Sequence, residues 1–250
     1  MADDKDYLPD ESAVLETIEV APAMTADLNE AGAAGFHILR TLELDPYEVA
    51  GPQGLAEAAE LAAVASEDFT GHDRKAAKIS IAAGPATAFN DLGALLASLP
   101  PDATMAHHNP PIGTQETSDR VAEEKKNVRV NAWLYAASRE NDNDYHTIIG
   151  SDPSKTPRIF MNAEVSGLPP AGSSALSALK AVRSSFAAIV QHKPLAGYDF
   201  YNPPRPVTVE GSLFFDVTHA HGGSTPGPPQ TKPHTIWEIH PITSLKPRTP

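Results

Sequence analysis

The stretch VRVNAWLYA, residues 128–136, decides how this chain folds. Apolar residues occupy every second position in it, and between them stand Arg129, Asn131, Trp133 and Tyr135. Successive side chains of a strand point to opposite faces, so a period of two predicts a strand with one face in a core. The residues upstream follow a helical period, which places the main change of structure near residue 127.

Four segments downstream predict further strands. They are YHTIIG (145–150), RIFMNAEV (158–165), PVTVEGSLFFDVTH (206–219) and HTIWEIHPIT (234–243), and turn-forming residues separate them. Their β-branched and aromatic residues favour an extended backbone. The last two segments follow one another across a loop rich in Gly and Pro, so we expect them to pair antiparallel.

A helix is predicted between the third and the fourth of the five strands. Ser173 or Ser174 can cap it, and its apolar stripe consists of Leu176, Leu179, Val182, Phe186 and Ile189. The resulting order, β-β-β-α-β-β, is that of a five-stranded OB-type barrel. We therefore predict an α+β chain in which a mainly helical N-terminal region precedes an OB-like β-barrel over residues 127–246.

Charge and composition divide the chain further. Of the net charge of −13, residues 1–115 carry −14 and residues 116–250 carry +1. We predict a flexible acidic arm (1–20), a mainly helical acidic domain (21–100), a Pro-rich linker (101–122) and the barrel domain (123–250). The acidic half should repel phosphate and the neutral half lacks a basic stripe, so a nucleic-acid partner is not favoured.

Two helices are predicted within the acidic domain. Strong helix formers and a regular apolar stripe indicate one over residues 55–65. A second is predicted after Pro85, with Phe89 and Leu92 on its stripe, and it should end before Pro100. Residues 36–49 fit either a helix or a strand, and we favour the helix.

The sequence also excludes several classes of protein. It contains no cysteine, which rules out disulfide scaffolds, thiolate zinc sites and cysteine nucleophiles. It has no run of about 18 apolar residues and its acidic start is unlike a secretory signal, so we expect a cytoplasmic protein without membrane association. P-loop, G-x-S-x-G and H-E-x-x-H motifs are absent as well.

Histidines and carboxylates recur on the predicted strands. Glu238 and His240 are two residues apart and therefore share a face, while Asp216 and His219 lie on the neighbouring strand. Together with His146 on the second strand they could bind a divalent metal or perform acid–base catalysis. The alternatives are a polar strand face and a hydrogen-bonded pair within the barrel. Strand parity separates Asp216 from His219 unless a bulge intervenes.

Three aromatic residues form a second candidate site. Trp133, Tyr135 and Phe160 fall on the face opposite the core residues of their strands. Exposed rings on such a barrel could stack on a base, a sugar or a peptide side chain. The alternative is that they pack beneath the N-terminal domain or a partner subunit.

Several of these segments resemble a group of uncharacterised bacterial OB-fold-like proteins. VEGSLFFDVTHAHG followed by IWEIHPITSLK resembles the group's pattern F-F-D-x-x-H … E-[IL]-H-P, and NDYHTIIGSD and RIFMNAEVSGLPP resemble its second and third strands. The resemblance covers residues 127–246 and implies the fold, without an established activity. Its implied signature is Asp144, His146, Glu164, Asp216, His219, Glu238 and His240.

Two functions follow as hypotheses. The first is a non-enzymatic binding or assembly module that recognises a protein or small-molecule ligand and needs no cofactor. It is favoured because established catalytic motifs are absent and an aromatic face is predicted. The alternative is a metal-dependent hydrolase with a divalent metal held by His146, Asp216, His219, Glu238 and His240.

Overall fold

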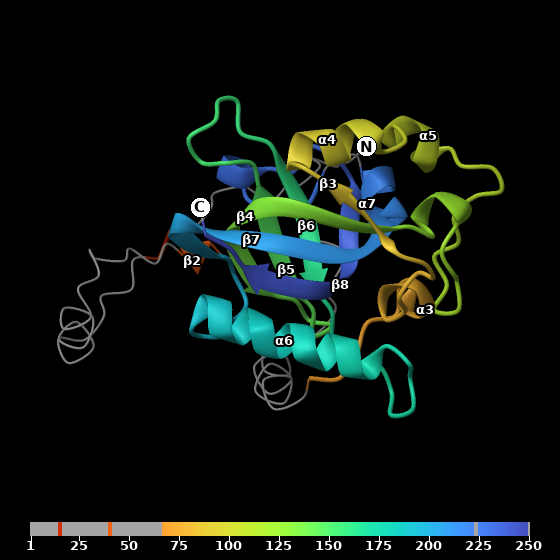
Figure 1. Cartoon of the computed structure of the whole chain (residues 1–250). Coiled ribbons are helices and arrows are strands. Elements are labelled where there is room, and N and C mark those ends of the chain that lie inside the picture. Colours follow the sequence, from red (N-terminus) through yellow and green to blue (C-terminus); the bar gives the residue numbers. More distant parts are fainter. Residues whose placement is uncertain (1–14, 17–39, 42–66, 223–224, 250) are drawn as a thin grey trace, which may run out of the picture.

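The computed structural model of this chain describes residues 15–16, 40–41, 67–222 and 225–249 (Figure 1). The main sheet has six strands: β3 (Ala86–Phe89), β4 (Asn127–Arg139), β5 (Tyr145–Gly150), β6 (Phe160–Val165), β7 (Asp199–Phe215) and β8 (Trp237–Pro247). The helices are α3 (Lys75–Lys78), α4 (Leu92–Ser98), α5 (Asp102–Ala106), α6 (Leu176–Val190) and α7 (Val217–Gly222), with short 3-10 turns η1 (Ala122–Glu124) and η2 (Pro229–Thr231). Within these residues, no helix combines the length and apolar character needed to cross a membrane.

Five of the strands ring round until the sheet meets itself. β4 pairs antiparallel with β5, and β5 pairs antiparallel with β6. β6 then pairs in parallel with β8, β8 pairs antiparallel with β7, and β7 returns to β4. β3 lies parallel to the first residues of β4. The predicted order of three strands, one helix and two strands is confirmed.

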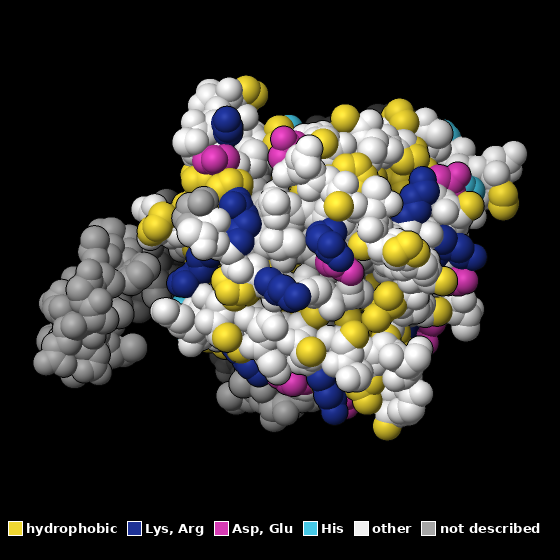
Figure 2. All heavy atoms as spheres, in the orientation of Figure 1, with side chains coloured by type: hydrophobic (Ala, Val, Ile, Leu, Met, Phe, Trp, Pro, Cys, Tyr) yellow, Lys and Arg dark blue, Asp and Glu magenta, His cyan; other side chains and the backbone are white. Residues whose placement is uncertain are grey.

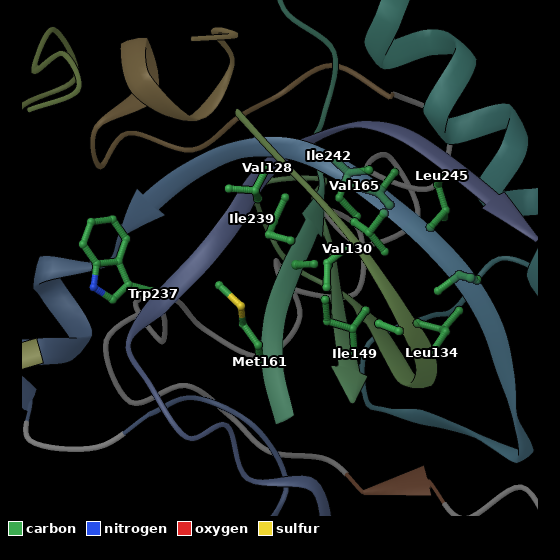
Figure 3. Packing of buried hydrophobic residues seen from close by; sticks show 14 of the residues in the cluster. Val128, Val130, Leu134, Ile149, Met161, Val165, Trp237, Ile239, Ile242 and Leu245 are labelled. Carbon is green, nitrogen blue, oxygen red and sulfur yellow. The ribbon is translucent and has the colours of Figure 1, made fainter. Parts of the chain in front are cut away.

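The inside of this ring is apolar. Val130, Ile149, Met161 and Ile239 meet there as members of one large cluster of buried side chains (Figure 3). The alternation of β4 predicted this arrangement, because its inward positions carry the apolar residues. Gly211 lets β7 and β8 approach closely, since a Cβ atom there would overlap the carbonyl oxygen of Pro241.

Helix α6 lies on one side of the ring in Figure 1, and α4 and α5 lie on the other. The predicted stripe of α6 is confirmed where it meets the core, as Val182, Phe186 and Ile189 are buried. Arg183 is buried as well, which the pattern did not predict. Its guanidinium donates hydrogen bonds to the carbonyl oxygens of Asn143 and Ser166, at 2.9 and 3.0 Å.

The helix predicted after Pro85 is shorter than its apolar spacing indicated. Residues 86–89 form β3 because they pair with β4, so Phe89 is not helical. Helix α4 begins at Leu92, and the Asp91 carboxylate caps it by accepting a hydrogen bond from the Ala94 N–H at 2.8 Å. Leu92 and Leu95 pack in the same cluster as the ring.

Most of the predictions for residues 1–66 lie outside the described residues, including the acidic arm and the helix over 55–65. The described pieces are β1 (Leu15–Glu16) and β2 (Arg40–Thr41), which pair antiparallel. The helix favoured over residues 36–49 is therefore wrong at Arg40–Thr41, where pairing with another segment outweighs local propensity. The division into domains stays a prediction.

The face drawn in Figure 2 lies over β4 and β7. Lys and Arg side chains are spread across it, and the apolar atoms form separate small groups. Arg129 of β4 pairs with Glu210 of β7 at 2.7 Å. The basic side chains of this face are therefore interspersed with acidic and neutral ones.

Candidate functional site

Five charged residues gather on the outside of the ring, and we call them the outer charged cluster: Asp144, His146, Glu164, Glu238 and His240. Neighbouring inward residues such as Tyr145 and Ile239 belong to the core, so the alternation of the strands turns this set to the other face. The register sets His146 directly opposite Glu164 on β6. All five side chains are buried although they lie outside the ring.

Short contacts join the members of the cluster. His146 Nδ1 lies 3.0 Å from Glu164 Oε1, and His240 Nε2 lies 3.2 Å from Asp144 Oδ2. His240 Nδ1 is 3.7 Å from Glu238 Oε2. The Asn162 amide donates to Glu238 Oε1 at 3.3 Å across the seam between β6 and β8. The cluster therefore spans three strands.

Burial and charge act against one another on the two histidines. Burial disfavours the charged imidazoles, but Glu164 outweighs it for His146 and raises the pKa to about 10. Asp144 and Glu238 similarly raise the pKa of His240 to about 9. Burial also raises the pKa of Glu164, even though His146 opposes this. Both histidines are therefore cations at neutral pH.

Hydrogen bonding within the cluster is incomplete. Among the described residues, His146 Nε2 and Glu164 Oε2 are buried and have no hydrogen-bond partner. A buried polar atom without a partner costs about 1–3 kcal/mol, so folds rarely keep one without a reason. Strongly perturbed titratable groups of this kind concentrate at functional sites.

A polar pocket of about 310 Å³ adjoins one end of the cluster, since Asp142 in its lining accepts a hydrogen bond from the Asp144 N–H at 3.1 Å. It lies between the β4–β5 connection, the end of β7 and the segment before α3. The side chains that line it are mostly polar and carry both signs of charge; they include Asn141, Asp142, Asp216, Thr218, His219 and Lys78.

Asp216 and His219 belong to this pocket rather than to the outer charged cluster. β7 ends at Phe215, and Asp216 caps α7 by accepting hydrogen bonds from the N–H groups of Thr218 (3.0 Å) and His219 (3.1 Å). Its other oxygen lies 2.7 Å from His219 Nδ1. The strand predicted through His219 is therefore wrong at its end. The short helix α7, rather than a bulge in the strand, brings the two side chains together.

Lys78 connects the pocket with the cluster, and no local pattern in the sequence predicts this role. Its Nζ lies 3.7 Å from Asp142 Oδ2. Burial opposes the positive charge of Lys78. The combined negative charge of four carboxylates outweighs burial and raises the pKa of Lys78; they are Asp142, Asp216, Asp144 and Glu238. Lys78 is therefore a permanent ammonium and not a nucleophile. Only the tertiary fold brings it here, since 64 residues separate it from Asp142 in the sequence.

The predicted metal ligands are thus divided between two places. His146, Glu238 and His240 lie in the outer charged cluster, and Asp216 and His219 lie in the pocket. In the part of the chain that the structure describes, no three His, Asp or Glu side chains are arranged to hold a metal ion.

The aromatic residues occupy the outer face but are mostly covered. Tyr135 and Phe160 are buried edge to face with ring centroids 5.0 Å apart, so these two rings are covered rather than exposed for stacking. They pack with Ile148 in a second apolar cluster. Trp133 is half-buried, and the Arg248 guanidinium lies 4.0 Å from its ring centroid.

Comparisons with protein-family models, curated proteins and solved structures found no match for this chain. The resemblance to the bacterial OB-fold-like group stays a prediction, and the function has to be inferred from the geometry of the pocket and the outer charged cluster.

Proposed function

We propose that this chain is a non-enzymatic binding module built on an OB-like barrel, with the pocket around Lys78, Asp142 and Asp216 as its ligand site. The ligand is a small molecule or a short segment of a protein partner. The barrel assignment is supported by the ring of pairings and by α6, which stands between its third and fourth strands.

The position of the pocket supports a binding role. OB-type barrels bind ligands through the connection between their first two strands and the connection between their last two. In this chain those connections follow β4 and β7, and they supply Asn141, Asp142, Thr218 and His219 to the pocket. Fold alone does not define a function, so the chemistry of the lining carries more weight than this analogy.

The observation that carries the proposal is that the charged groups of the pocket continue into the outer charged cluster. Lys78 interacts with Asp142 and Asp216 in the pocket and with Asp144 in the cluster. Buried charges with incomplete hydrogen bonding destabilise a fold, and binding a ligand can offset that cost. A pocket with a few convergent polar groups and perturbed pKa values is the usual form of a binding site.

Nuclear magnetic resonance can test this proposal with a library of small polar fragments. We expect fragments to shift the amide signals of Asn141, Gly71 and Thr218, which line the pocket. The variant Thr218→Trp should fill the pocket and abolish the shifts. Thr208→Trp, on the outer face of β7, is the matched control and should leave them unchanged. Shifts that survive Thr218→Trp would contradict the proposal.

A hydrolase is the second candidate, and the Asp216–His219 pair favours it. A carboxylate that holds an imidazole 2.7 Å away is the arrangement of a general base. A metal-dependent form would draw its ligands either from this pair or from His146, Glu238 and His240, because the predicted ligands are divided between two places. Elemental analysis of protein purified without a His-tag tests that form, since a true site should retain about one equivalent of metal. Turnover of generic ester or phosphate substrates that Asp216→Asn abolishes would favour the hydrolase over the binding module.

A further inference from the structure

We infer that the pocket takes an uncharged, hydroxyl-rich ligand of the saccharide or polyol class, in which one hydroxyl group bridges Lys78 and Asp142. This inference rests on the proposed function, because it names the ligand of the same pocket. It depends on the spacing of two side chains and on the signs of the charges around them.

The first step concerns the gap between Lys78 and Asp142. The 3.7 Å from Lys78 Nζ to Asp142 Oδ2 is too long for a hydrogen bond. Both side chains are reachable from the pocket, with exposed fractions of 18% and 11%. Among the described residues the Lys78 ammonium makes no hydrogen bond, although it has three donors. At this length the contact is an ion pair without a direct hydrogen bond, so each group can still make a hydrogen bond to a water or to a ligand hydroxyl.

The second step excludes an anionic ligand. An anion that accepted hydrogen bonds from Lys78 would also approach Asp142 and Asp216, both of which line the pocket. Four carboxylates act on the Lys78 ammonium, so its charge is already more than balanced. The repulsion between a further negative charge and these groups would outweigh its attraction to the Lys78 ammonium, because Arg74, which also lines the pocket, is already paired with Glu124.

The third step disfavours a cationic ligand. Lys78 lines the pocket, so an amine bound there would lie beside a second ammonium group. Both oxygens of the Asp216 carboxylate are occupied, because one caps α7 and the other contacts His219 Nδ1. An ammonium ligand would therefore have to displace contacts that already stabilise the fold.

A neutral hydroxyl group suits the gap between the Lys78 ammonium and the Asp142 carboxylate. It accepts a hydrogen bond from the ammonium and donates one to the carboxylate at the same time. Both hydrogen bonds involve a charged partner, which makes each of them stronger than a bond between neutral groups. Thr70, Asn141 and Thr218 add short neutral side chains to the lining, and these suit further hydroxyls of the same ligand.

The test is a binding panel of four classes at equal concentration: neutral saccharides and polyols, carboxylates and phosphates, amines, and zwitterionic amino acids. Binding is followed by the amide shifts of the pocket residues in the full chain. We expect the saccharide and polyol class to bind. Lys78→Met and Asp142→Asn should each weaken that binding about tenfold or more, because each removes one end of the bridge.

Lys75→Met is the matched control, since Lys75 is a neighbouring lysine on α3 that does not line the pocket. Its affinity should equal that of the unmodified chain. Lys78→Arg keeps the charge with a different geometry and should stay folded while losing affinity, which separates a binding defect from unfolding.

The outcomes separate this inference from the proposed function. Pocket shifts caused only by anions, amines or amino acids would overturn the ligand class and leave the binding module standing. Saccharide binding that is equal in Lys78→Met, Asp142→Asn and Lys75→Met would overturn the bridge. No pocket shift with any class would overturn the binding module itself.

Discussion

Two buried groups of charges in this protein are built in opposite ways. One is the pair of Arg74 and Glu124, in which the guanidinium donates to both carboxylate oxygens at 2.7 Å. Each of those oxygens also accepts a backbone N–H, from Phe215 on one side and from Val121 on the other, both at 2.8 Å. The Glu124 carboxylate is therefore fully hydrogen-bonded. The outer charged cluster, by contrast, leaves atoms of His146 and Glu164 without partners in the described part of the chain.

The difference indicates two different roles. The Arg74–Glu124 pair joins the segment before α3 to η1 and to the end of β7. Arg74 Nε has no hydrogen-bond partner among the described residues, but the fully bonded Glu124 carboxylate suits a structural link. Arg74 also lies 4.6 Å from the centroid of the Phe214 ring. The hydrogen bonding of the outer charged cluster is incomplete, so burying these charges contributes less to stability than burying a fully bonded pair. This fits a role in ligand binding.

Breaking the Arg74–Glu124 pair should have the largest effect. Glu124→Gln leaves the Arg74 guanidinium buried without its counter-charge, and we expect a loss of about 3–5 kcal/mol in the free energy of unfolding. Urea denaturation measures this loss. Glu123→Gln changes the partly exposed neighbour and is the control, with an expected change within about 0.5 kcal/mol. Similar losses in both variants would contradict the contrast between the two groups.

The outer charged cluster should make the free energy of unfolding depend on pH. In the folded protein the pKa values of His146 and His240 are about 10 and 9, against 6.5 for an ordinary histidine. Their stabilising contribution is complete below pH 6.5 and is lost as pH rises through these values. We expect the free energy of unfolding to fall by up to about 1.4 kcal/mol per pH unit for each histidine between pH 7 and 9.

Denaturation curves between pH 6 and 10 measure this slope. The double variant His146→Gln with His240→Asn should flatten it, because the groups that hold the extra protons are gone. A stability of the unmodified protein that is constant from pH 7 to 10 would show that these histidines are not held as cations.

A single substitution can test which contact in the cluster sets the pKa of His146. Glu164→Gln removes the negative charge that contributes most to raising the pKa of His146. The pKa of His146 should therefore fall, as nuclear magnetic resonance titration can show. Glu140→Gln is the control, since Glu140 acts on His146 only through a weaker charge interaction. An equal response to both substitutions would mean that the 3.0 Å contact between His146 and Glu164 does not set the pKa.

The smallest effect concerns the hydroxyl groups of two tyrosines, Tyr135 and Tyr201. The Tyr135 hydroxyl donates to the Ser151 carbonyl oxygen at 2.9 Å, so Tyr135→Phe should cost about 1 kcal/mol. The Tyr201 hydroxyl is buried and has no partner among the described residues, and Tyr201→Phe should be neutral or stabilising. Urea denaturation of both variants distinguishes them, and the reverse order of stability would contradict this account.

Much of the ring could be predicted because its strands follow the period of two. β5 has the predicted bounds, and β4 contains the predicted stretch. The beginning of β7 could not be predicted, since Pro203, Pro204 and Pro206 indicate a break in any strand. Phe200 nevertheless pairs with Ala136 of β4, and this pairing extends the strand to Asp199.

The candidate site was predictable only in part. The histidines and carboxylates on one strand face follow from spacing, which placed Glu238 and His240 together correctly. Spacing could not show that β7 stops at Phe215, because the helix that follows depends on the Asp216 cap. Lys78 and Asp142 come from distant parts of the chain, and no local pattern predicts a contact of that kind.

The short seam between β6 and β8 has a consequence for how the chain folds. Only Asn162 with Glu238 and Ala163 with Ile239 are paired there, and 76 residues separate Asn162 from Glu238. The β4–β6 meander and the β7–β8 hairpin each form from contacts closer in sequence, whereas the seam must close a long loop. We therefore expect the seam to form late and to make folding slow. Its amide protons should also be the first in the ring to exchange with solvent.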